Sequence, residues 1–279
     1  MAYTGPTSND INLDELIVPA KEAKKLSRFT YLLIGGPGGG KSATSLTIPS
    51  DHSAIHLDFD GKTEHIKAAS PDNVSIVDLV VNSDDAQKQA LIVEQILKAK
   101  QEGRIKQNWI FLDSLTSIFQ LYSYEAHRTL GGSPYRLNYD KQDYVKGTFW
   151  KTLLKCFGLF EYTVLTAHET ARQDVEGNTI IQPLAVKQLS EGLAGRFQNF
   201  FHATNKGGGD EVVYVWETRP SGIYQCNTAI KDLPYVVPNH FDLILSTKWE
   251  EVPDVKTAVK LYQERTGRKL TRWDATKIK

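Results

Sequence analysis

The stretch that decides the fold runs from Phe29 to Ser42 and reads FTYLLIGGPGGGKS. Its first half is apolar and rich in residues that favour strands, and its second half is a glycine-rich turn that closes on Lys41 and Ser42. Gly35, the four residues after it, Gly40, Lys41 and Ser42 match the P-loop pattern G-x-x-x-x-G-K-[ST] without a mismatch. The sequence therefore predicts a strand, a phosphate-binding loop and a helix, in that order.

The predicted loop suits a triphosphate because of its backbone and its charge. Backbone N–H groups converge on a cluster of negative charges only in turn conformations that favour glycine. We expect Lys41 to reach the β- and γ-phosphates of ATP and the Ser42 hydroxyl to ligate Mg²⁺. The residues predicted to contact the nucleotide are Gly35, Gly36, Pro37, Gly38, Gly39, Gly40, Lys41, Ser42 and Ala43. The alternative interpretation is a flexible glycine turn followed by a chance Lys-Ser pair.

The helix that follows the loop is expected to begin near Lys41, so that its N-terminal N–H groups face the phosphates. It should be short, because Pro49 ends it.

Composition restricts the class of protein. In 279 residues, an apolar fraction of 41% and five Trp suffice for a buried core. Lys plus Arg equal Asp plus Glu at 33 each, so a site for a polyanion must be a local patch. Cys156 and Cys226 lie far apart and outside any C-x-x-C pattern, which argues against a zinc site or a disulfide scaffold. Without a signal peptide or a membrane span, we expect a cytoplasmic protein.

Strand-like and helical patterns alternate through the first two-thirds of the chain. This order predicts an α/β fold with a mainly parallel sheet, helices on both faces and a β-rich C-terminal extension. Glu176-Gly177-Asn178 indicates a hairpin within 170–183. Strands are expected at 29–34, 53–59, 74–80, 109–112, 162–166, 201–204, 211–217 and 222–228, with a last short one at 243–246. Helices are expected at 84–100, 115–130, 143–160, 187–200 and 255–263.

A second acid for Mg²⁺ is predicted at the end of the segment NWIFLD, residues 108–113. This segment is an apolar strand that ends in a carboxylate, the Walker B pattern, and Asp113 would hold the cation through water. The alternative is that Asp113 caps the helix that follows it.

Several side chains are candidates for activating water. Asp58 and Asp60 end the second predicted strand, and Asp60 is the first candidate, with Glu64 and Glu169 as rivals. Each of them also fits an exposed loop acid. His168 follows the strand at 162–166, where a polar side chain is placed to touch the γ-phosphate or the attacking water, although it also fits a structural histidine.

With these motifs in place, the chain resembles a family from about Phe29 to Ser246: the phage RecA-like P-loop ATPases of the single-strand-annealing type. The segments that carry the resemblance are LLIGGPGGGKS, HLDFDG, IFLDSLTSI, QDYVKGTFWK, VLTAHE and IKDLP, in this order. The resemblance implies a RecA-like core in which another strand lies between the P-loop and Walker B strands. It also implies a lead-in at 1–28, an ATPase domain at 29–250 and a helical tail at 251–279.

The resemblance implies roles for single residues as well. It places the P-loop on ATP, Asp113 on Mg²⁺, Asp60 at the position of the catalytic acid and His168 at that of the γ-phosphate sensor. Asp60 stands where RecA relatives carry Glu, and the shorter side chain leaves room for a weak ATPase. Family members form rings or filaments with ATP at subunit borders, so a cation is expected to act in trans. Candidates for it are Lys231, Arg196 and Arg219.

Single-stranded DNA is the partner that the resemblance implies. Residues 135–151 mix cations with Tyr and Trp, which suits phosphates and unpaired bases, although the helical part after Asp143 also fits a helix with its aromatic residues in the core. A second candidate region surrounds the hairpin, from Arg172 to Lys187. The residues predicted to bind DNA are Arg128, Arg136, Lys141 and Arg172.

The predicted function is therefore ATP hydrolysis coupled to annealing or strand exchange in phage recombination, in the cytoplasm of a bacterial host. The predicted partners are further copies of the chain and a single-strand-binding protein, with no membrane. The alternatives are a replicative-helicase or loader motor, and an ATP-binding assembly protein with little turnover.

Overall fold

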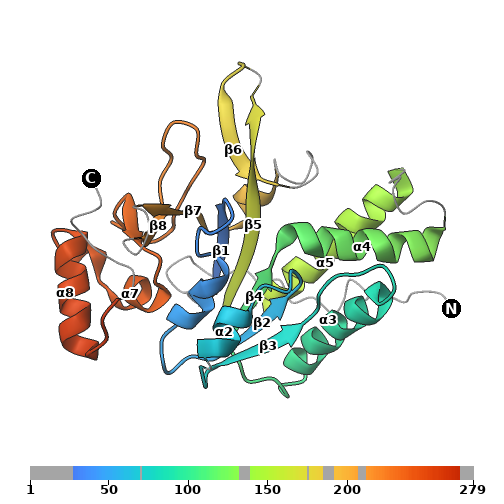
Figure 1. Ribbon diagram of the computed structural model, residues 1–279, viewed down its shortest axis with the longest axis horizontal. Helices are drawn as coiled ribbons and strands as arrows, with labels where there is room; N and C mark the ends of the chain where they lie inside the picture. The colour runs from blue at the N-terminus through green and yellow to red at the C-terminus, as the bar shows by residue number, and fades with distance from the viewer. Residues whose placement is uncertain are drawn as a thin grey trace, which may run out of the picture.

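The computed structural model describes residues 28–69, 71–131, 139–174, 176–184, 192–206 and 212–270. Within them, the strands run in the order β3-β2-β4-β5-β1-β7-β8-β9, and β6 pairs with β5 outside that path (Figure 1). The strands are β1 (Phe29–Gly35), β2 (Ala54–Asp58), β3 (Val74–Asp78), β4 (Trp109–Asp113), β5 (Tyr162–Gln173), β6 (Thr179–Pro183), β7 (Asn199–Lys206), β8 (Val213–Glu217) and β9 (Val236–Pro238).

The helices cover both faces of this sheet. The α-helices are α2 (Glu64–Ala69), α3 (Ala86–Gln101), α4 (Leu115–Leu130), α5 (Tyr139–Leu159), α7 (Phe241–Ser246) and α8 (Val255–Thr266). The 3₁₀ segments are η2 (Ser42–Thr47), η3 (Ala194–Arg196) and η5 (Trp249–Glu251). Among the described residues, no helix combines the length and apolar character needed to cross a membrane.

Strand β5 lies between β1 and β4, and all three run parallel. The strand that ends in the glycine loop and the strand that ends in Asp113 are therefore separated by one strand, as the resemblance implied. The register pairs Gly35 with His168 and Asp58 with Asp113, so these residues meet at the carboxyl edge of the sheet. This mainly parallel α/β arrangement, with one strand between the glycine-loop strand and the Asp113 strand, confirms the predicted α/β fold class.

Alternation along the strands divides the apolar core into two layers. On β1, Leu32 and Ile34 pack on one face with α3, α4 and α5, and Tyr31 and Leu33 pack on the other with α7, η5 and α8. Because successive side chains of a strand point to opposite faces, a strand covered on both sides reads as a continuous apolar run. The segment YLLI is such a run.

The C-terminal third departs most from the predicted elements. Residues 243–246, predicted as a strand, lie in α7, where the His240 side chain accepts a hydrogen bond from the Leu243 N–H at the helix start. A short apolar run does not distinguish a buried helix from a strand. Residues 222–228 form isolated bridges in place of a strand, and β9 was not predicted. The predicted helix at 187–200 is wrong at its end, where β7 begins at Asn199, and its first part lies largely outside the described residues.

Phe241 is central to the second layer of the core. Its ring centroid lies 5.0 Å from that of Tyr31 and 4.8 Å from those of both Trp109 and Trp216. We predict that Phe241→Ala lowers the free energy of unfolding by about 3–5 kcal/mol, because a buried ring leaves a cavity that the aromatic neighbours do not fill. Urea denaturation measures this loss. Tyr139→Ala is the control, since that side chain is 84% exposed, and an equal loss in both variants would contradict the prediction.

Candidate nucleotide-binding site

A cavity of about 870 Å³ opens at the carboxyl edge of the sheet. It brings together residues from the glycine loop, from the end of β4, from the middle of β5, from the segment after β2 and from the C-terminal third of the chain. Its lining comprises Pro37, Gly38, Gly39, Gly40, Lys41, Ser42, Ala43, Leu46, Thr47, Asp60, Lys62, His65, Asp113, Ser114, His168, Tyr214, Pro238, Asn239, His240, Lys269 and Leu270. Gly35 and Gly36 adjoin the loop, and neither lines the cavity.

The loop needs glycine for both conformation and space. Gly38 and Gly40 have φ angles of 76° and 78°, in the left-handed region that other residues rarely adopt. A Cβ on Gly40 would also lie 2.7 Å from Cδ1 of Tyr214. The helix that follows differs from expectation, because Ser42–Thr47 is a single 3₁₀ segment with Lys41 as its N-terminal flank. The phosphate binding predicted for this loop would therefore depend on the turn amides and Lys41, and less on a helix dipole.

Lys41 is buried and turns back onto the loop. Its Nζ donates hydrogen bonds to the carbonyl oxygens of Gly35, at 2.8 Å, and Gly36, at 2.9 Å. Burial lowers the pKa of the ammonium below its ordinary value, and the nearby carboxylates of Asp113 and Glu169 oppose that shift. The two carbonyls hold the positive charge beside the loop, where Lys41 also lines the cavity.

Asp113 is the last residue of β4 and is buried. Its Oδ1 accepts a hydrogen bond from the Thr166 hydroxyl, and its Oδ2 lies 3.4 Å from Nε2 of His56. Burial raises the pKa of this carboxyl, but His56 and the hydroxyls of Ser42 and Thr166 outweigh it, so the pKa lies below the ordinary value. Mg²⁺ prefers oxygen ligands such as carboxylates and hydroxyls, so the Asp113 carboxylate and the Ser42 hydroxyl fit this cation.

The alternative role for Asp113 as a helix cap does not apply. Ser114 occupies the N-cap position of α4, and no side chain caps that helix end.

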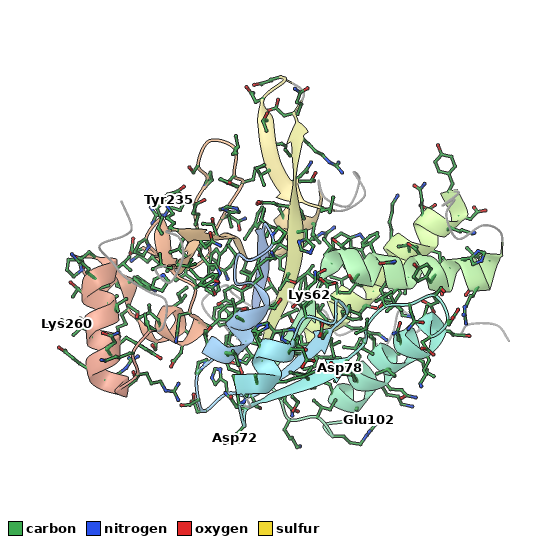
Figure 2. All side chains as sticks on the ribbon, viewed as in Figure 1. Lys62, Asp72, Asp78, Glu102, Tyr235 and Lys260 are labelled. Atoms are coloured by element: carbon green, nitrogen blue, oxygen red, sulfur yellow. The ribbon has the colours of Figure 1, made fainter. Side chains whose placement is uncertain are left out.

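Asp60 lies in the cavity on the segment after β2. Its carboxylate accepts hydrogen bonds from the hydroxyls of Ser114, at 3.1 Å, and Ser117, and lies 3.4 Å from Nζ of Lys62 and 3.8 Å from Nε2 of His168. Burial raises the pKa of Asp60, but His168, Ser117 and the charge of Lys62 together hold it well below the ordinary range. Because its pKa is lowered, the Asp60 carboxylate is a weak base. Figure 2 shows Lys62 near the middle of the molecule, by this segment.

The rival acids lie elsewhere. Glu64 is exposed and pairs with Lys67 at 2.9 Å. Glu169 is outside the lining of the cavity, and its Oε2 lies 2.9 Å from Nε2 of His202, a buried histidine of β7. The other ring nitrogen of His202 lies 3.0 Å from Oε2 of Glu217 on β8. The sequence did not single out this three-residue network, because its members come from three strands and share no local pattern.

Asp58 holds the segment that carries Asp60. One carboxylate oxygen accepts hydrogen bonds from the N–H groups of Asp60, Gly61 and Lys62, and the other from the N–H and the hydroxyl of Thr63. The carboxylate is fully buried, so these donors complete its hydrogen bonding. Of the two acids at this strand end, Asp58 is thus structural and Asp60 faces the cavity.

Replacing Asp58 tests this division of roles. We predict that Asp58→Asn lowers the free energy of unfolding by about 1–3 kcal/mol, because the new NH₂ group meets N–H donors that then lack an acceptor. Urea denaturation provides the measurement.

Asp78→Asn is the matched control for this substitution. Asp78 pairs with Asp58 in the β2–β3 register, is exposed and forms a surface ion pair with Lys67, so little change is expected (Figure 2). A stable Asp58→Asn variant, or equal losses in the two proteins, would show that the Asp58 hydrogen bonds do not support the segment.

The part of the cavity lining that comes from the C-terminal third of the chain was missed by sequence reasoning. Tyr214, Asn239, His240, Lys269 and Leu270 form it, and they come from β8, the segment after β9 and the segment after α8. None lies near the glycine loop in sequence, and only the order of strands in the sheet brings them there.

His240 supplies a pH-dependent contribution to stability. Burial lowers its pKa to about 4, against an ordinary value of 6.5. The folded chain binds a proton less readily than the unfolded chain, so the contribution is complete above pH 6.5 and is lost as the pH falls toward 4. On going from pH 7 to pH 4.5, we predict that the free energy of unfolding falls in both proteins. The fall should be about 2–3 kcal/mol larger in the unmodified protein than in His240→Asn.

Asn keeps a side-chain acceptor at the start of α7, so His240→Asn removes the titration and retains a helix cap. Equal acid losses in the two proteins would mean that His240 binds a proton as readily in the folded chain as in the unfolded one.

The residues predicted to supply a cation in trans lie outside the cavity. The Lys231 side chain is 81% exposed and lies 3.8 Å from a carboxylate oxygen of Asp232. Arg196 lies over the ring of Trp150 at 5.7 Å, and Arg219 donates to the carbonyl oxygen of Leu233 at 2.8 Å. The cations that do line the cavity from this chain, besides Lys41, are Lys62 and Lys269.

The residues predicted to contact DNA do not form one cluster. Arg172 lies on the part of β5 that projects with β6 beyond the rest of the sheet (Figure 1), whereas Arg128 is in the last turn of α4 and donates to the Ser83 carbonyl oxygen at 2.7 Å. Lys141 is 3% exposed, with Nζ 3.5 Å from Nδ1 of His127, so its predicted contact with DNA is corrected. Arg136 lies outside the described residues.

No protein-family model matches this sequence, and no curated protein matches it either. Among solved structures, one that matches is a KaiC-like protein from the hyperthermophilic archaeon Pyrococcus horikoshii, with 14% sequence identity and a TM-score of 0.38. The match covers 70% of this chain and 83% of that one. At this identity and score, nothing about activity follows from the likeness.

Proposed function

We propose that this protein binds and hydrolyses ATP in the cavity at the carboxyl edge of its sheet, and that it acts on single-stranded DNA in phage recombination, by annealing or strand exchange. The observation that carries the ATP part is the convergence of Lys41, Ser42, Asp113, Asp60 and His168 on one cavity. They come from four separate segments of the chain, and the P-loop motif alone does not require that they meet.

Each residue has a role in the proposal. The amides of the glycine loop and Lys41 bind the phosphates. Ser42 and Asp113 would hold Mg²⁺, which would supply positive charge to neutralise the phosphate oxygens. Asp60 orients the attacking water. His168, in the middle of β5 where β1 ends beside it, contacts the γ-phosphate side of the cavity, and β5 continues past it into the β5–β6 hairpin.

One observation favours slow turnover. The carboxylate of Asp60 already accepts from two hydroxyls and lies close to Lys62 and His168. A carboxylate stabilised in this way has little tendency to take a proton from water. This favours, as a second candidate function, an ATP-binding assembly protein in which binding, more than hydrolysis, drives association between copies of the chain.

The proposed DNA contacts and oligomer rest on the resemblance and on shape. The β5–β6 hairpin projects beyond the sheet and carries Arg172, which suits a contact with a nucleic-acid strand (Figure 1). Lys231 is exposed and lies outside the cavity, as a residue that completes a neighbouring subunit's site would. Arg128 is also exposed on its surface, at the end of α4.

ATP turnover tests the proposal directly. We expect slow hydrolysis by the unmodified protein, with a rise when a single-stranded oligonucleotide is added at low salt. Lys41→Ala should abolish both nucleotide binding and turnover, because the buried ammonium is lost. Asp60→Asn should abolish turnover and leave binding intact. Asp60→Glu should raise turnover several-fold, since the longer side chain extends the carboxylate past the Ser114 and Ser117 hydroxyls.

Lys67→Ala is the matched control, because Lys67 is an exposed lysine whose partners, Glu64 and Asp78, lie outside the cavity. Absence of ATP binding would overturn the whole proposal. Absence of DNA binding at low salt, with and without ATP, would overturn the recombination part alone. Nucleotide-dependent assembly without measurable turnover would select the assembly protein, and unwinding of a forked duplex would select a helicase.

A further inference from the structure

His56 is a polar side chain in the most buried part of the sheet. It lies in the middle of β2, where all five residues are buried, and none of its surface is exposed. Its ring stacks on Phe111 of β4 with centroids 5.6 Å apart and an interplanar angle of 7°. Ile55 and Leu57, its neighbours on β2, are apolar. Burying an imidazole costs free energy that an apolar residue here would not, so packing alone gives no reason for it.

The polar atoms of His56 face Asp113, a residue of the proposed cation site, and Ser45, which contacts the backbone of Ser42. Nδ1 lies 3.2 Å from the Ser45 hydroxyl, and that hydroxyl lies 3.3 Å from the Ser42 carbonyl oxygen. Nε2 lies 3.4 Å from Oδ2 of Asp113. The imidazole thus spans the distance between η2, which begins with Ser42, and the end of β4, which carries Asp113.

Two buried atoms in this arrangement lack a hydrogen-bond partner. They are Nε2 of His56 and Oδ2 of Asp113, and their 3.4 Å separation brings them together without a hydrogen bond of normal geometry. Asp113 also lines the cavity. Buried polar groups are as a rule hydrogen-bonded, so this unpaired contact beside a cavity-lining carboxylate needs an explanation other than packing.

We propose that His56 is a positioning residue for the cation site: it holds the Asp113 carboxylate and the segment of Ser42 at the separation that Mg²⁺ requires. This proposal rests on the proposed function. Outer partners of ligand side chains commonly fix the orientation of those ligands, and their loss weakens metal binding about 10–100-fold. His56 contacts neither nucleotide nor cation in this scheme and acts through Asp113 and Ser45.

Two substitutions test the contributions of the two ring nitrogens of His56 one at a time. Gln places its amide nitrogen near the position of Nε2, facing Asp113, whereas Asn places it near Nδ1, facing Ser45. The readout is the Mg²⁺ concentration at half-saturation for binding of a fluorescent, non-hydrolysable ATP analogue. We expect His56→Gln to stay within about threefold of the unmodified protein and His56→Asn to require about tenfold more Mg²⁺ or beyond.

His56→Leu distinguishes a role of His56 in positioning Asp113 from a role in packing the core. We expect it to unfold at a urea concentration no lower than the unmodified protein, since an apolar side chain suits this part of the core, and still to need about tenfold more Mg²⁺. This variant keeps the test decisive should His56→Asn fail to fold. His52→Asn is the matched control. It makes the same change at a histidine outside the cavity, whose Nδ1 accepts a hydrogen bond from Nε1 of Trp109 at 2.9 Å, and should leave the Mg²⁺ requirement unchanged.

The outcomes distinguish this proposal from the proposed function. A Mg²⁺ requirement that is the same in the Leu, Asn and Gln variants and the unmodified protein overturns the role of His56, while ATP binding by all of them leaves the proposed function intact. Equal weakening of Mg²⁺-free nucleotide binding in every His56 variant also overturns it, because that result indicates a general disturbance. No nucleotide binding by the unmodified protein overturns the proposed function and the cation site with it.

Discussion

Lys41 and Asp113 carry opposite charges into a part of the protein that water barely reaches. Each charge remains there because polar groups surround it: two loop carbonyls for the ammonium, and hydroxyls and an imidazole for the carboxylate. Those groups come from β1, η2, β2 and β5, so the charges can be accommodated only when the parallel strands pair in this register. The two buried charges need these polar partners, and the partners come together only in this order of strands. The local conformation of the loop therefore depends on the order of strands in the sheet.

The same demand explains which parts of the site could be predicted from the sequence. A phosphate-binding loop has to be continuous in sequence, since neighbouring amides form it, and the match from Gly35 to Ser42 was accordingly complete. Asp113 ends a strand whose five residues are all buried, so the apolar run WIFL located it. His168 was found because it follows a strand with a strong β-branched pattern.

What sequence reasoning missed has no local signature. Tyr214, His240 and Leu270 reach the cavity from segments far from the loop, through strand order alone. The residues 243–246 were read as a strand because four apolar or small residues satisfy either period, and the helix forms because His240 caps it. Lys141 was assigned to DNA by its charge, but its place on α5 buries it against α4. Residue type indicates chemistry, and burial decides whether that chemistry can be used.

Strand β5 has one further property that concerns motion. It runs without a break from Tyr162 in the middle of the sheet, past His168 at the cavity, to Gln173 in the hairpin, where β6 stiffens it by antiparallel pairing. At about 3.3 Å per residue, roughly 17 Å of continuous strand separates His168 from Gln173, where β5 ends. If this paired ribbon turned as a unit, a rotation of about five degrees at the level of His168 would displace its far end by roughly 1.5 Å.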